Sequence, residues 1–484
     1  MIRLSFLLKG RVAASALALG LTVSACATAP VGTPKVLPEA TAGGFIADTG
    51  QGTVSAPARD DWWRLYDDPM LDALVLQALG NNNELEAAIA NLRVVRASLG
   101  EARAARLPST RLGASGSYGR AAATTVPGSG GQPLDETETW EVGLDVAYEI
   151  DLFGRVGSTI AAARADADAA GAALDVVRVS VAAETARAYT EVCSANVQIA
   201  VAEQTIDLQS RTLELTERLL GAGSGTGLDV ARARSAVASS QAALPPLRAQ
   251  KDAAVFRLAT LTGVTPREVS QAVMDCAAPP RLTQPIPVGD GAALLARRPD
   301  VRRAERDLAA ASARVDVATA SLYPSIQLGG SVGATAMDLG ELGDDGALRF
   351  SVGPLISWSF PNVAVARSRI EAAGGLAEAA LARFDQTVLV ALQETETALS
   401  AYGHALDRRQ ALTVSRDAAA DAARLARARF DAGADSFLTV LDAERTLAQT
   451  DAALAQAEAQ VADLQIQLFK ALAGGWAPPE DLPN

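Results

Sequence analysis

The sequence has little of what most enzymes need at a reactive centre. Its 484 residues include a single histidine, His404, and three cysteines. One histidine cannot supply a metal site that needs paired histidines, and it leaves at most one candidate for the base of a catalytic triad. The glycine-rich stretch GAGSGTG at 221–227 lacks the lysine of a phosphate-binding loop and follows a predicted helix, so we interpret it as a helix-to-helix turn. We expect no enzymatic activity, no metal site and no cofactor.

The start of the chain, positions 1–26, resembles a secretion signal. A basic start precedes an apolar run at about 12–23, which is too short for a membrane-spanning helix. Small residues before Cys26 resemble a bacterial lipoprotein signal, and an ordinary secretory signal is the alternative. We expect removal of 1–25 and a covalent lipid on Cys26 that anchors the chain. Because Ala27 does not resemble an inner-membrane retention signal, we expect a location at the outer membrane of a Gram-negative bacterium.

The chain is acidic and poor in cysteine. Its net charge of −13 makes a nucleic-acid partner unexpected. After removal of the signal, Cys193 and Cys276 remain, and outside the cytosol they could form a disulfide. Two separate, mostly buried thiols fit the sequence equally well.

The chain contains an internal repeat. Pro108 matches Pro324 at an offset of 216, and Val142 matches Val352 at an offset of 210. Each half is predicted to read helix, proline, strand, loop, strand, very long helix, glycine turn and long helix. The smaller second offset predicts a shorter loop between the two strands of the second half.

Two predicted helices are too long for an ordinary globular domain. They cover about 157–220 and 364–430, and the first would be on the order of 95 Å long at about 1.5 Å per residue. Shorter return helices are predicted at about 228–262 and 438–472. The consecutive prolines at 245–246 should break or kink the first return helix. A structural coiled-coil lipoprotein is an alternative that such helices leave open.

Strands are predicted where apolar and polar residues alternate, most clearly in WEVGLDVAYEID (140–151) and LRFSVGPLISWSF (348–360). Aromatic residues on the apolar face stand eight residues apart, roughly 26 Å at about 3.3 Å per residue. This length is close to the apolar band of outer-membrane strands, about 25 Å with aromatic girdles at both rims. The predicted girdle is Trp140, Tyr148, Phe350 and Trp358. The predicted water-facing charges, which would line a lumen, are Glu141, Asp145, Glu149 and Arg349.

The number of predicted strands requires an oligomer. Each unpaired backbone group in lipid costs several kcal/mol, and the smallest outer-membrane barrels use about eight strands. Four strands in one chain cannot close a barrel, so we expect a cyclic assembly. Two copies would give eight strands and three would give twelve, and the count alone does not decide between them.

Four segments together resemble the TolC-like outer membrane factors, and the lipoprotein branch that works with resistance-nodulation-division efflux pumps is most similar. The resemblance covers nearly the whole mature chain. The segments are DDWWRLYDDPMLDALVLQAL (60–79), YEIDLFGRV (148–156), RRPDVRRAERDLAAASARVDVATASLYPSIQLGGSVG (297–333) and RFDAGADSFLTVLDAERTL (429–447).

The resemblance implies a fold that is mainly α with transmembrane β. A homotrimer would form a twelve-stranded barrel in the outer membrane, a long α-helical barrel in the periplasm and a mixed α/β equatorial belt. Implied partners are a periplasmic adaptor (membrane fusion) protein and an inner-membrane resistance-nodulation-division transporter. The implied function is a passive, gated duct for small amphiphilic compounds. The outlet of a type I protein secretion system is the alternative.

The resemblance also implies a gate at the periplasmic end of the helices. Leu438 and Asp442 match the positions that point inward in the family, and Asp229 matches the aspartate of a latch between hairpins. Asp435 stands where the latch arginine is expected, so that latch cannot form in its usual way. Alternatively, Leu438 packs and Asp442 compensates the dipole of a helix start. The possible substitutes for the arginine are Arg429 and Arg232.

The predicted organisation follows the repeat. The segments are a signal peptide (1–25), a lipidated extended segment (26–69), first-half helices (70–107), transmembrane strands 1–2 (108–152, loop about 120–138), the first long hairpin (153–263), an equatorial connection (264–299), the second-half helix (300–323), transmembrane strands 3–4 (324–361, loop about 336–347), the second long hairpin (362–473, gate tip near 431–442) and a tail (474–484).

Overall fold

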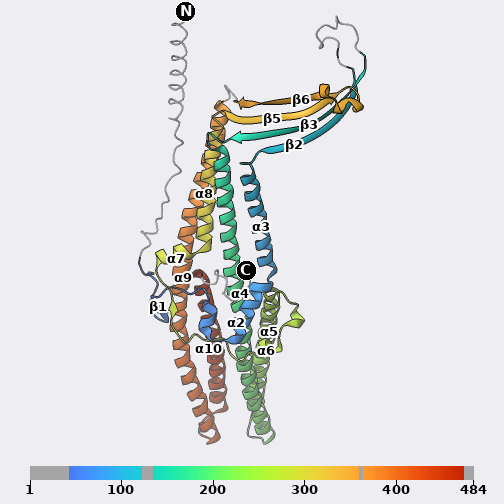
Figure 1. Ribbon diagram of the computed structural model, residues 1–484. Coiled ribbons are helices and arrows are strands. Elements are labelled where there is room, and N and C mark those ends of the chain that lie inside the picture. Colours follow the sequence, from blue (N-terminus) through green and yellow to red (C-terminus); the bar gives the residue numbers. More distant parts are fainter. Residues whose placement is uncertain (1–42, 49, 121, 123–134, 359–362, 474–484) are drawn as a thin grey trace, which may run out of the picture. The chain divides into compact units, whose positions relative to one another are not determined.

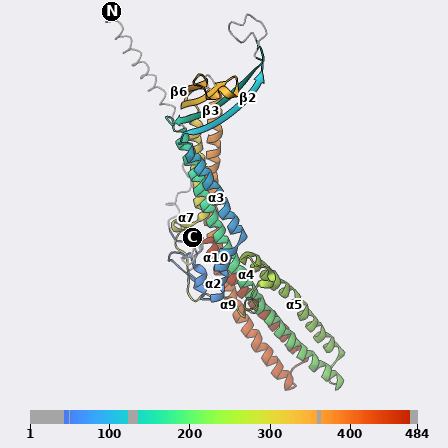
Figure 2. The same ribbon diagram turned by 45° about the vertical axis from the view of Figure 1, so that its right-hand side comes forward.

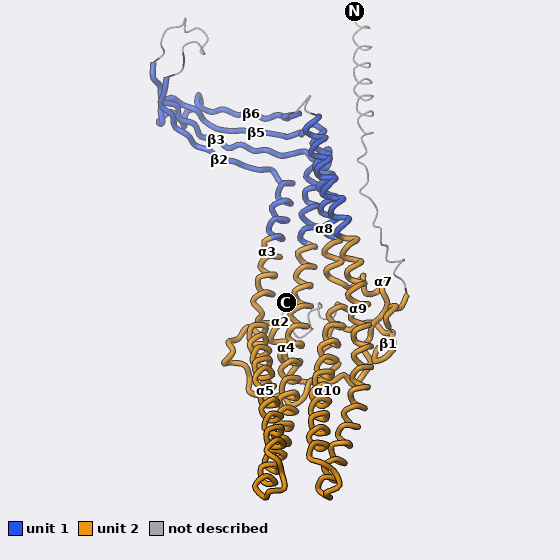
Figure 3. Tube along the Cα trace, turned by 180° about the vertical axis from the view of Figure 1, so that it is seen from behind, with its two compact units in different colours: residues 1–34, 95–167, 306–383 blue, residues 35–94, 168–305, 384–484 orange. Residues whose placement is uncertain are grey.

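The computed structural model describes residues 43–48, 50–120, 122, 135–358 and 363–473. These residues form two compact units (Figure 3). Unit 1 contains the described residues between 95 and 167 and between 306 and 383. Unit 2 contains those up to 94, between 168 and 305, and from 384 onward. Several long helices contribute residues to both units.

Unit 1 carries an antiparallel sheet of four strands in the order β2-β3-β5-β6 (Figure 1). Successive side chains of a strand point to opposite faces of a sheet, which matches the alternation of apolar and polar residues in the sequence. Among the described residues the outer strands β2 and β6 each have one neighbour, so both edges of the sheet are open there. The strands are β2 (Ser109–Gly119), β3 (Thr137–Ile150), β5 (Ser325–Ala336) and β6 (Leu348–Ser357).

The bounds of the helices show the predicted repeat. The first and last residues of α8 lie 216 positions after the first and last residues of α3. The first residue of α10 lies 210 positions after the first residue of α5. The long helices α4 and α9 are joined to α5 and α10 by short turns, which gives two hairpins (Figures 1 and 2). The helices are α3 (Asn83–Ala104), α4 (Arg155–Gly221), α5 (Gly227–Thr262), α8 (Pro299–Ala320), α9 (Val363–Asp431) and α10 (Phe437–Ala471).

None of the helices among the described residues combines the length and the apolar character that are needed to cross a membrane.

A proline stands at each change from helix to strand in unit 1. Helix α3 ends at Ala104 and β2 begins at Ser109, directly after Pro108. The second half repeats this junction, with β5 beginning at Ser325 directly after Pro324. Proline cannot donate to a helical carbonyl and biases the preceding residue to extended geometry. The two prolines therefore end each helix and start each strand as predicted.

Of the predicted break or kink in the first return helix, the break was wrong, and a kink stays a prediction. Helix α5 runs through Pro245 and Pro246 without interruption. Proline has a φ angle that suits a helix, but it lacks the donor for the carbonyl four residues earlier and its ring crowds that carbonyl. Gln241 and Ala242, whose carbonyls lose those partners, are exposed, so water can replace the missing donors.

The core of unit 2 joins a short aromatic segment to the long hairpins. The 3-10 helix η3 (Trp62–Tyr66) buries both of its tryptophans, and Trp62 stacks on Phe469 of α10 with a centroid distance of 4.7 Å. Such pairs contribute roughly 0.5–1.5 kcal/mol beyond the burial of their area. Helix α2 (Pro69–Asn81) continues this layer, and alanines dominate the buried faces of α4. This packing fixes the segment after residue 60 against the hairpins.

A connection between the two halves packs against the helices of unit 2. It contains α6 (Gln271–Met274), α7 (Gly291–Arg297) and the short strand β4 (Ile286–Pro287), which pairs in parallel with β1 (Thr53–Val54). A disulfide links Cys193 of α4 to Cys276, with 5.0 Å between the Cα atoms. Asn196, one turn further along α4, donates to the Cys276 carbonyl at 2.8 Å. The connection is thus fastened to α4 at two neighbouring points.

The return helices end against the starts of the shorter helices. The Nδ2 of Asn82, just before α3, donates to the carbonyl of Leu261 in α5 at 3.0 Å. Arg298, just before α8, donates to the carbonyl of Ala471 in α10 at 3.1 Å. Asn82 and Arg298 are separated by the repeat offset of 216. Each side chain satisfies a carbonyl that the end of a helix leaves without a partner.

Candidate functional site

The sheet of unit 1 has one apolar face. Leu144 of β3 lies opposite Val332 of β5, which lies opposite Phe350 of β6, and all three are exposed within the chain. Successive side chains of a strand alternate between faces, so the even-numbered residues of β3 and β6 share this face. An exposed apolar surface of this extent marks an interaction site for a membrane or a protein. The further apolar members of this face are Leu112, Val142, Tyr148, Leu328, Val352 and Ile356.

The predicted aromatic girdle lies on this face but at staggered levels. Trp140 lies opposite Ala336, while Phe350 is level with Leu144, four residues further along β3. Trp358 directly follows the end of β6 rather than lying within it. Strands tilted by about 35–45° produce an offset of this kind between strands that are not adjacent. The girdle remains a prediction, now with defined positions in the sheet.

The opposite face carries the predicted charges. Arg349 forms an ion pair with Glu141, and its Nε donates to Thr335 Oγ1 at 3.0 Å. The Arg349 side chain lies over Gly143, since a Cβ there would be 3.6 Å from its Nη2 atom. The structure therefore brings Glu141 and Arg349 together across three strands, and no sequence signal predicted this pair.

The other two predicted charges have different surroundings. Asp145 lies opposite Arg111 of β2 in the strand register. Glu149 forms an ion pair with Arg155, whose Nε donates to Glu149 Oε1 at 2.8 Å, close to the junction of β3 and α4. All these charges lie on one side of the sheet, which gives that side a polar surface with both signs of charge.

The tips of the two hairpins have the same backbone turn. Gly223 and Gly433, which are counterparts in the repeat, have φ angles of +73° and +68°, a left-handed conformation that glycine adopts without steric cost. In each tip the residue after the glycine donates to a carbonyl one turn back, from Ser224 to Leu219 and from Ala434 to Arg429. This geometry is a common helix end, and it confirms the helix-to-helix turn predicted at 221–227.

Two of the predicted gate residues, Leu438 and Asp442, lie along one groove of unit 2. Leu438 and Asp442 lie one turn apart on α10, and both line a groove of about 890 Å³ between α4, α5 and α10. Asp442 is exposed and lies 3.4 Å from Arg445. Arg232 of α5, proposed from the sequence as a latch residue, lines the same groove.

The predicted latch residues are not brought together. Asp229 accepts a hydrogen bond from Thr226 Oγ1 at 2.6 Å within the first tip. Asp435 accepts from Arg429 Nε at 3.0 Å within the second tip, and this hydrogen bond holds the pKa of Asp435 below its usual range. Each aspartate thus closes its own turn, and Arg429 is engaged inside its own hairpin.

A buried polar cluster that the sequence reading missed joins the two hairpins. Glu444 of α10 is 4% exposed and accepts from Thr212 of α4 at 2.9 Å, while Arg427 of α9 lies 3.5 Å from the carboxylate. Burial raises the pKa of Glu444, although the Thr212 hydrogen bond and the Arg427 charge act in the opposite direction. Buried carboxylates need such partners, because an unpaired charge is costly to remove from water.

The repeat contains the signal that could have revealed this cluster. Glu217 and Arg234 form an exposed ion pair at 3.0 Å between α4 and α5. Their repeat counterparts, at the offset of 210, are Arg427 and Glu444, which form the corresponding pair with its charges exchanged. The first pair is exposed and the second is largely buried, so equivalent backbone positions have different surroundings in the two halves.

Comparison with known proteins places these features in a class. A family model for outer membrane efflux proteins matches residues 74–264 and 292–474. The outer membrane protein OprJ of Pseudomonas aeruginosa is 30% identical over 96% of this chain and 95% of its own length. The pyoverdine export outer membrane protein OpmQ of Pseudomonas putida is 32% identical over 95% of this chain and 97% of its own.

Solved structures of outer-membrane channels have the same fold as this chain. The outer-membrane channel OprN has a TM-score of 0.87 at 36% identity and covers 93% of this chain and 100% of its own. The open state of the Neisseria gonorrhoeae MtrE outer membrane channel has a TM-score of 0.80 at 28% identity and covers 93% and 99%. The fold and the two-faced sheet thus define an outer-membrane channel. The chain belongs to the outer membrane efflux protein family.

Replacing Glu444 by glutamine should change how stability depends on pH. The folded pKa of Glu444 is raised above its unfolded value, so between the two values the folded state binds more protons than the unfolded state. Ionisation of Glu444 therefore lowers stability as pH rises through this window. We expect the Glu444→Gln variant to be as stable as the parent at acidic pH. As pH rises above the ordinary pKa range of glutamate, the variant should become more stable than the parent.

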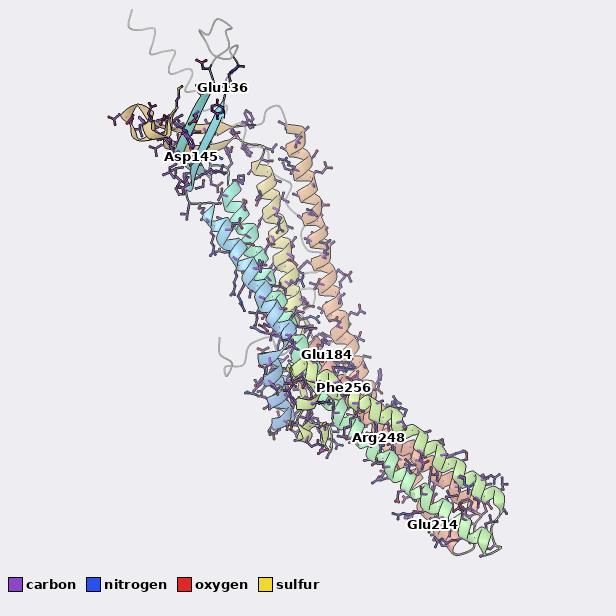
Figure 4. The ribbon with its side chains drawn as sticks, turned by 90° about the vertical axis from the view of Figure 1, so that its right-hand side faces the viewer. Glu136, Asp145, Glu184, Glu214, Arg248 and Phe256 are labelled. Atoms are coloured by element: carbon purple, nitrogen blue, oxygen red, sulfur yellow. A yellow bond between two sulfur atoms is a disulfide. The ribbon has the colours of Figure 1, made fainter. Side chains whose placement is uncertain are left out.

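The measurement is the unfolding temperature by circular dichroism in detergent, taken in steps from pH 4 to pH 8. Glu214→Gln, on an exposed position of α4 (Figure 4), is the matched control and should follow the parent throughout. A difference between Glu444→Gln and the parent that is constant with pH would contradict the expectation.

Proposed function

We propose that this chain is the passive, gated exit duct of a tripartite efflux system that carries small amphiphilic compounds out of the cell. The observation that carries the proposal is the sheet, which has one apolar and one charged face and open edges at β2 and β6. The relatives are named for the export of small compounds, among them pyoverdine, solvents and toluene. These names favour a small-molecule outlet over the outlet of a type I protein secretion system.

A homotrimer is the assembly that suits this function. Unpaired backbone groups at a sheet edge cost several kcal/mol each in lipid, so both edges must find partners. Three copies of the four-stranded sheet would supply a twelve-stranded closed barrel with a water-filled lumen. The apolar face would then contact lipid, and Glu141, Asp145, Glu149 and Arg349 would line the lumen.

The remaining parts of the system follow from the class of protein. A passive duct does not supply energy, so a transporter of the resistance-nodulation-division class in the inner membrane would drive export. A periplasmic adaptor protein would connect that transporter to the hairpin tips. The family is one of channels, and the proposed role involves no chemical step at any residue.

The efflux function can be tested by deleting the gene and restoring it from a plasmid. We expect deletion to lower the minimal inhibitory concentrations of amphiphilic drugs and dyes several-fold, and the plasmid to restore them, because the outlet is required for export. Secreted proteins are compared in the same cultures. Unchanged drug susceptibility together with loss of a secreted protein would reject the efflux proposal in favour of protein secretion.

The gate is proposed at Leu438 and Asp442. These side chains share one face of α10 near the tip of the second hairpin, where three leucines could narrow and dewet a pore. We expect Leu438→Ala combined with Asp442→Ala to raise single-channel conductance in planar bilayers, because both removed groups would restrict the opening.

The control removes the same types of side chain from the first hairpin, with Leu228→Ala and Glu214→Ala. Its conductance should stay at the parental value. If the double variant at 438 and 442 keeps the parental conductance while its oligomer remains intact, the gate does not lie at these residues.

A lipid anchor on Cys26 is the last part of the proposal. Cys26 lies outside the described residues, and the proposal rests on the small residues before it in the sequence. A multiply acylated cysteine would hold the chain stably, at about 0.8 kcal/mol per buried CH2. We expect labelling with a palmitate analogue to be lost in Cys26→Ser and kept in Cys276→Ser. Labelling of Cys26→Ser at the parental level would rule out this anchor.

A further inference from the structure

A cavity of about 300 Å³ lies in unit 1, where three strands of the sheet meet their helices. Its lining comes from the junction of β3 with α4, the junction of α8 with β5, the end of β6 and the start of α9 (Figure 1). Pockets that hold small ligands measure about 300–1,000 Å³, so this cavity has room for a small polar group. Leu438 and Asp442 belong to the other unit, so the proposed gate has no part in it.

The acidic residues of the lining differ in what they can still bind. Glu149 forms an ion pair with Arg155, so both charges are satisfied within the chain. Asp151 accepts from the backbone N–H groups of Val156 at 3.0 Å and Gly157 at 2.7 Å. Each carboxylate oxygen has a second lone pair, so Asp151 can accept a further hydrogen bond from a ligand.

Arg369 of α9 is the remaining cation of the lining. Its side chain is exposed, and no residue in the part of the chain that the structure describes forms an ion pair with it. A guanidinium group donates hydrogen bonds in a planar fork that matches the oxygen atoms of a phosphate. The cavity therefore offers one available cation and one available carboxylate.

An apolar and aromatic wall borders these charges. Phe153 stacks on Tyr323 with a centroid distance of 4.7 Å, and both line the cavity. The Nε1 of Trp358 donates to a backbone carbonyl between α8 and β5 at 3.2 Å, while its side chain stays exposed. Ile150, on the apolar face of β3, and Val365 of α9 complete this wall. Aromatic residues of this kind concentrate at the level of lipid headgroups in membrane proteins.

The repeat shows that the fold of a junction does not require these residues. The counterpart of Phe153 at the offset of 210 is Val363, and that of Tyr323 at the offset of 216 is Leu107. Arg369 has Thr159 as its counterpart at the offset of 210. The equivalent positions thus carry neither the aromatic pair nor the cation.

We propose that this cavity binds the headgroup of a zwitterionic glycerophospholipid, with the phosphate at Arg369 and a primary ammonium group at Asp151. In a channel whose helical barrel lies in the periplasm, the end of the sheet that joins the helices stands at the periplasmic leaflet. The acyl chains would then lie on the apolar face of the sheet beyond Ile150 and Trp358. Free phosphate would gain nothing from that face.

Charge balance favours a zwitterion over an anionic lipid. The lining contains two arginines and two carboxylates, so a headgroup with both signs of charge complements it better than a headgroup with negative charge alone. The inference goes beyond export, and it rests on the part of the proposed function that places the sheet in the membrane.

The test is native mass spectrometry of the full chain in detergent, titrated with a phosphatidylethanolamine. We expect lipid adducts on the parent at a several-fold lower lipid concentration than on Arg369→Gln, because this variant loses the cation that holds the phosphate. Diacylglycerol with the same acyl chains has no phosphate and should bind parent and variant equally weakly. Equal phosphatidylethanolamine binding by Arg369→Gln and the parent would overturn the site.

Arg367→Gln is the matched control. Arg367 is exposed near the start of the same helix and does not line the cavity, because two residues turn the side chain by about 200° around the helix axis. It removes the same charge and should bind the lipid as the parent does. An equal loss of binding in both variants would mean that the lipid follows the surface charge, and the cavity would not be its site.

Two further ligands separate the headgroup from simpler anions. Phosphatidylglycerol lacks the ammonium group and should bind less tightly than phosphatidylethanolamine, and binding at least as tight would overturn the contact with Asp151. Inorganic phosphate that binds as tightly as the lipid would overturn a lipid ligand. A parent protein that binds no lipid but restores drug resistance to the deletion strain would overturn the lipid site and leave the efflux duct intact.

Discussion

The last carbonyl groups of a buried helix need hydrogen-bond donors. In each half of this chain a side chain supplies such a donor, and the two side chains occupy equivalent positions of the repeat. Asn82 donates to Leu261 in the first half, and Arg298 donates to Ala471 in the second. An unpaired buried acceptor costs about 1–3 kcal/mol, so these contacts fix where α3 and α8 begin against the return helices. Arg298 also pairs with Asp300 and Glu394, which anchors the second join more strongly than the first.

Local sequence predicted the elements because their causes are local. Alternation gave the strands, and the repeat placed Pro108 and Pro324 directly before β2 and β5. The pairing of Arg349 with Glu141 could not be predicted in this way, since it depends on the register of three strands. The continuity of α5 through the prolines at 245–246 depends on whether its freed carbonyls face water, which only the packed structure shows.

The missed cluster around Glu444 shows a second limit of the same kind. From the sequence alone, a glutamate in an alanine-rich helix is predicted to be exposed to solvent. Only the packed structure shows whether a neighbouring helix covers it. Glu444 is covered because α10 packs against α4, whereas its counterpart Arg234 lies on α5 and forms an exposed ion pair with Glu217. The repeat duplicates the backbone, and the neighbouring helices decide which copy of a residue is buried.

The two halves also differ in the charged residues that they place at the proposed gate. Rings of carboxylates favour cations when the carboxylates stand alone. Asp442 does not, because Arg445 lies 3.4 Å away and Arg232, its counterpart in the first hairpin, lines the same groove. In a trimer each Asp442 would have arginines of both hairpins nearby, so the tip would not present an uncompensated ring of carboxylates. A passage of this kind would discriminate by size and dewetting at Leu438 more than by the charge of what passes through it.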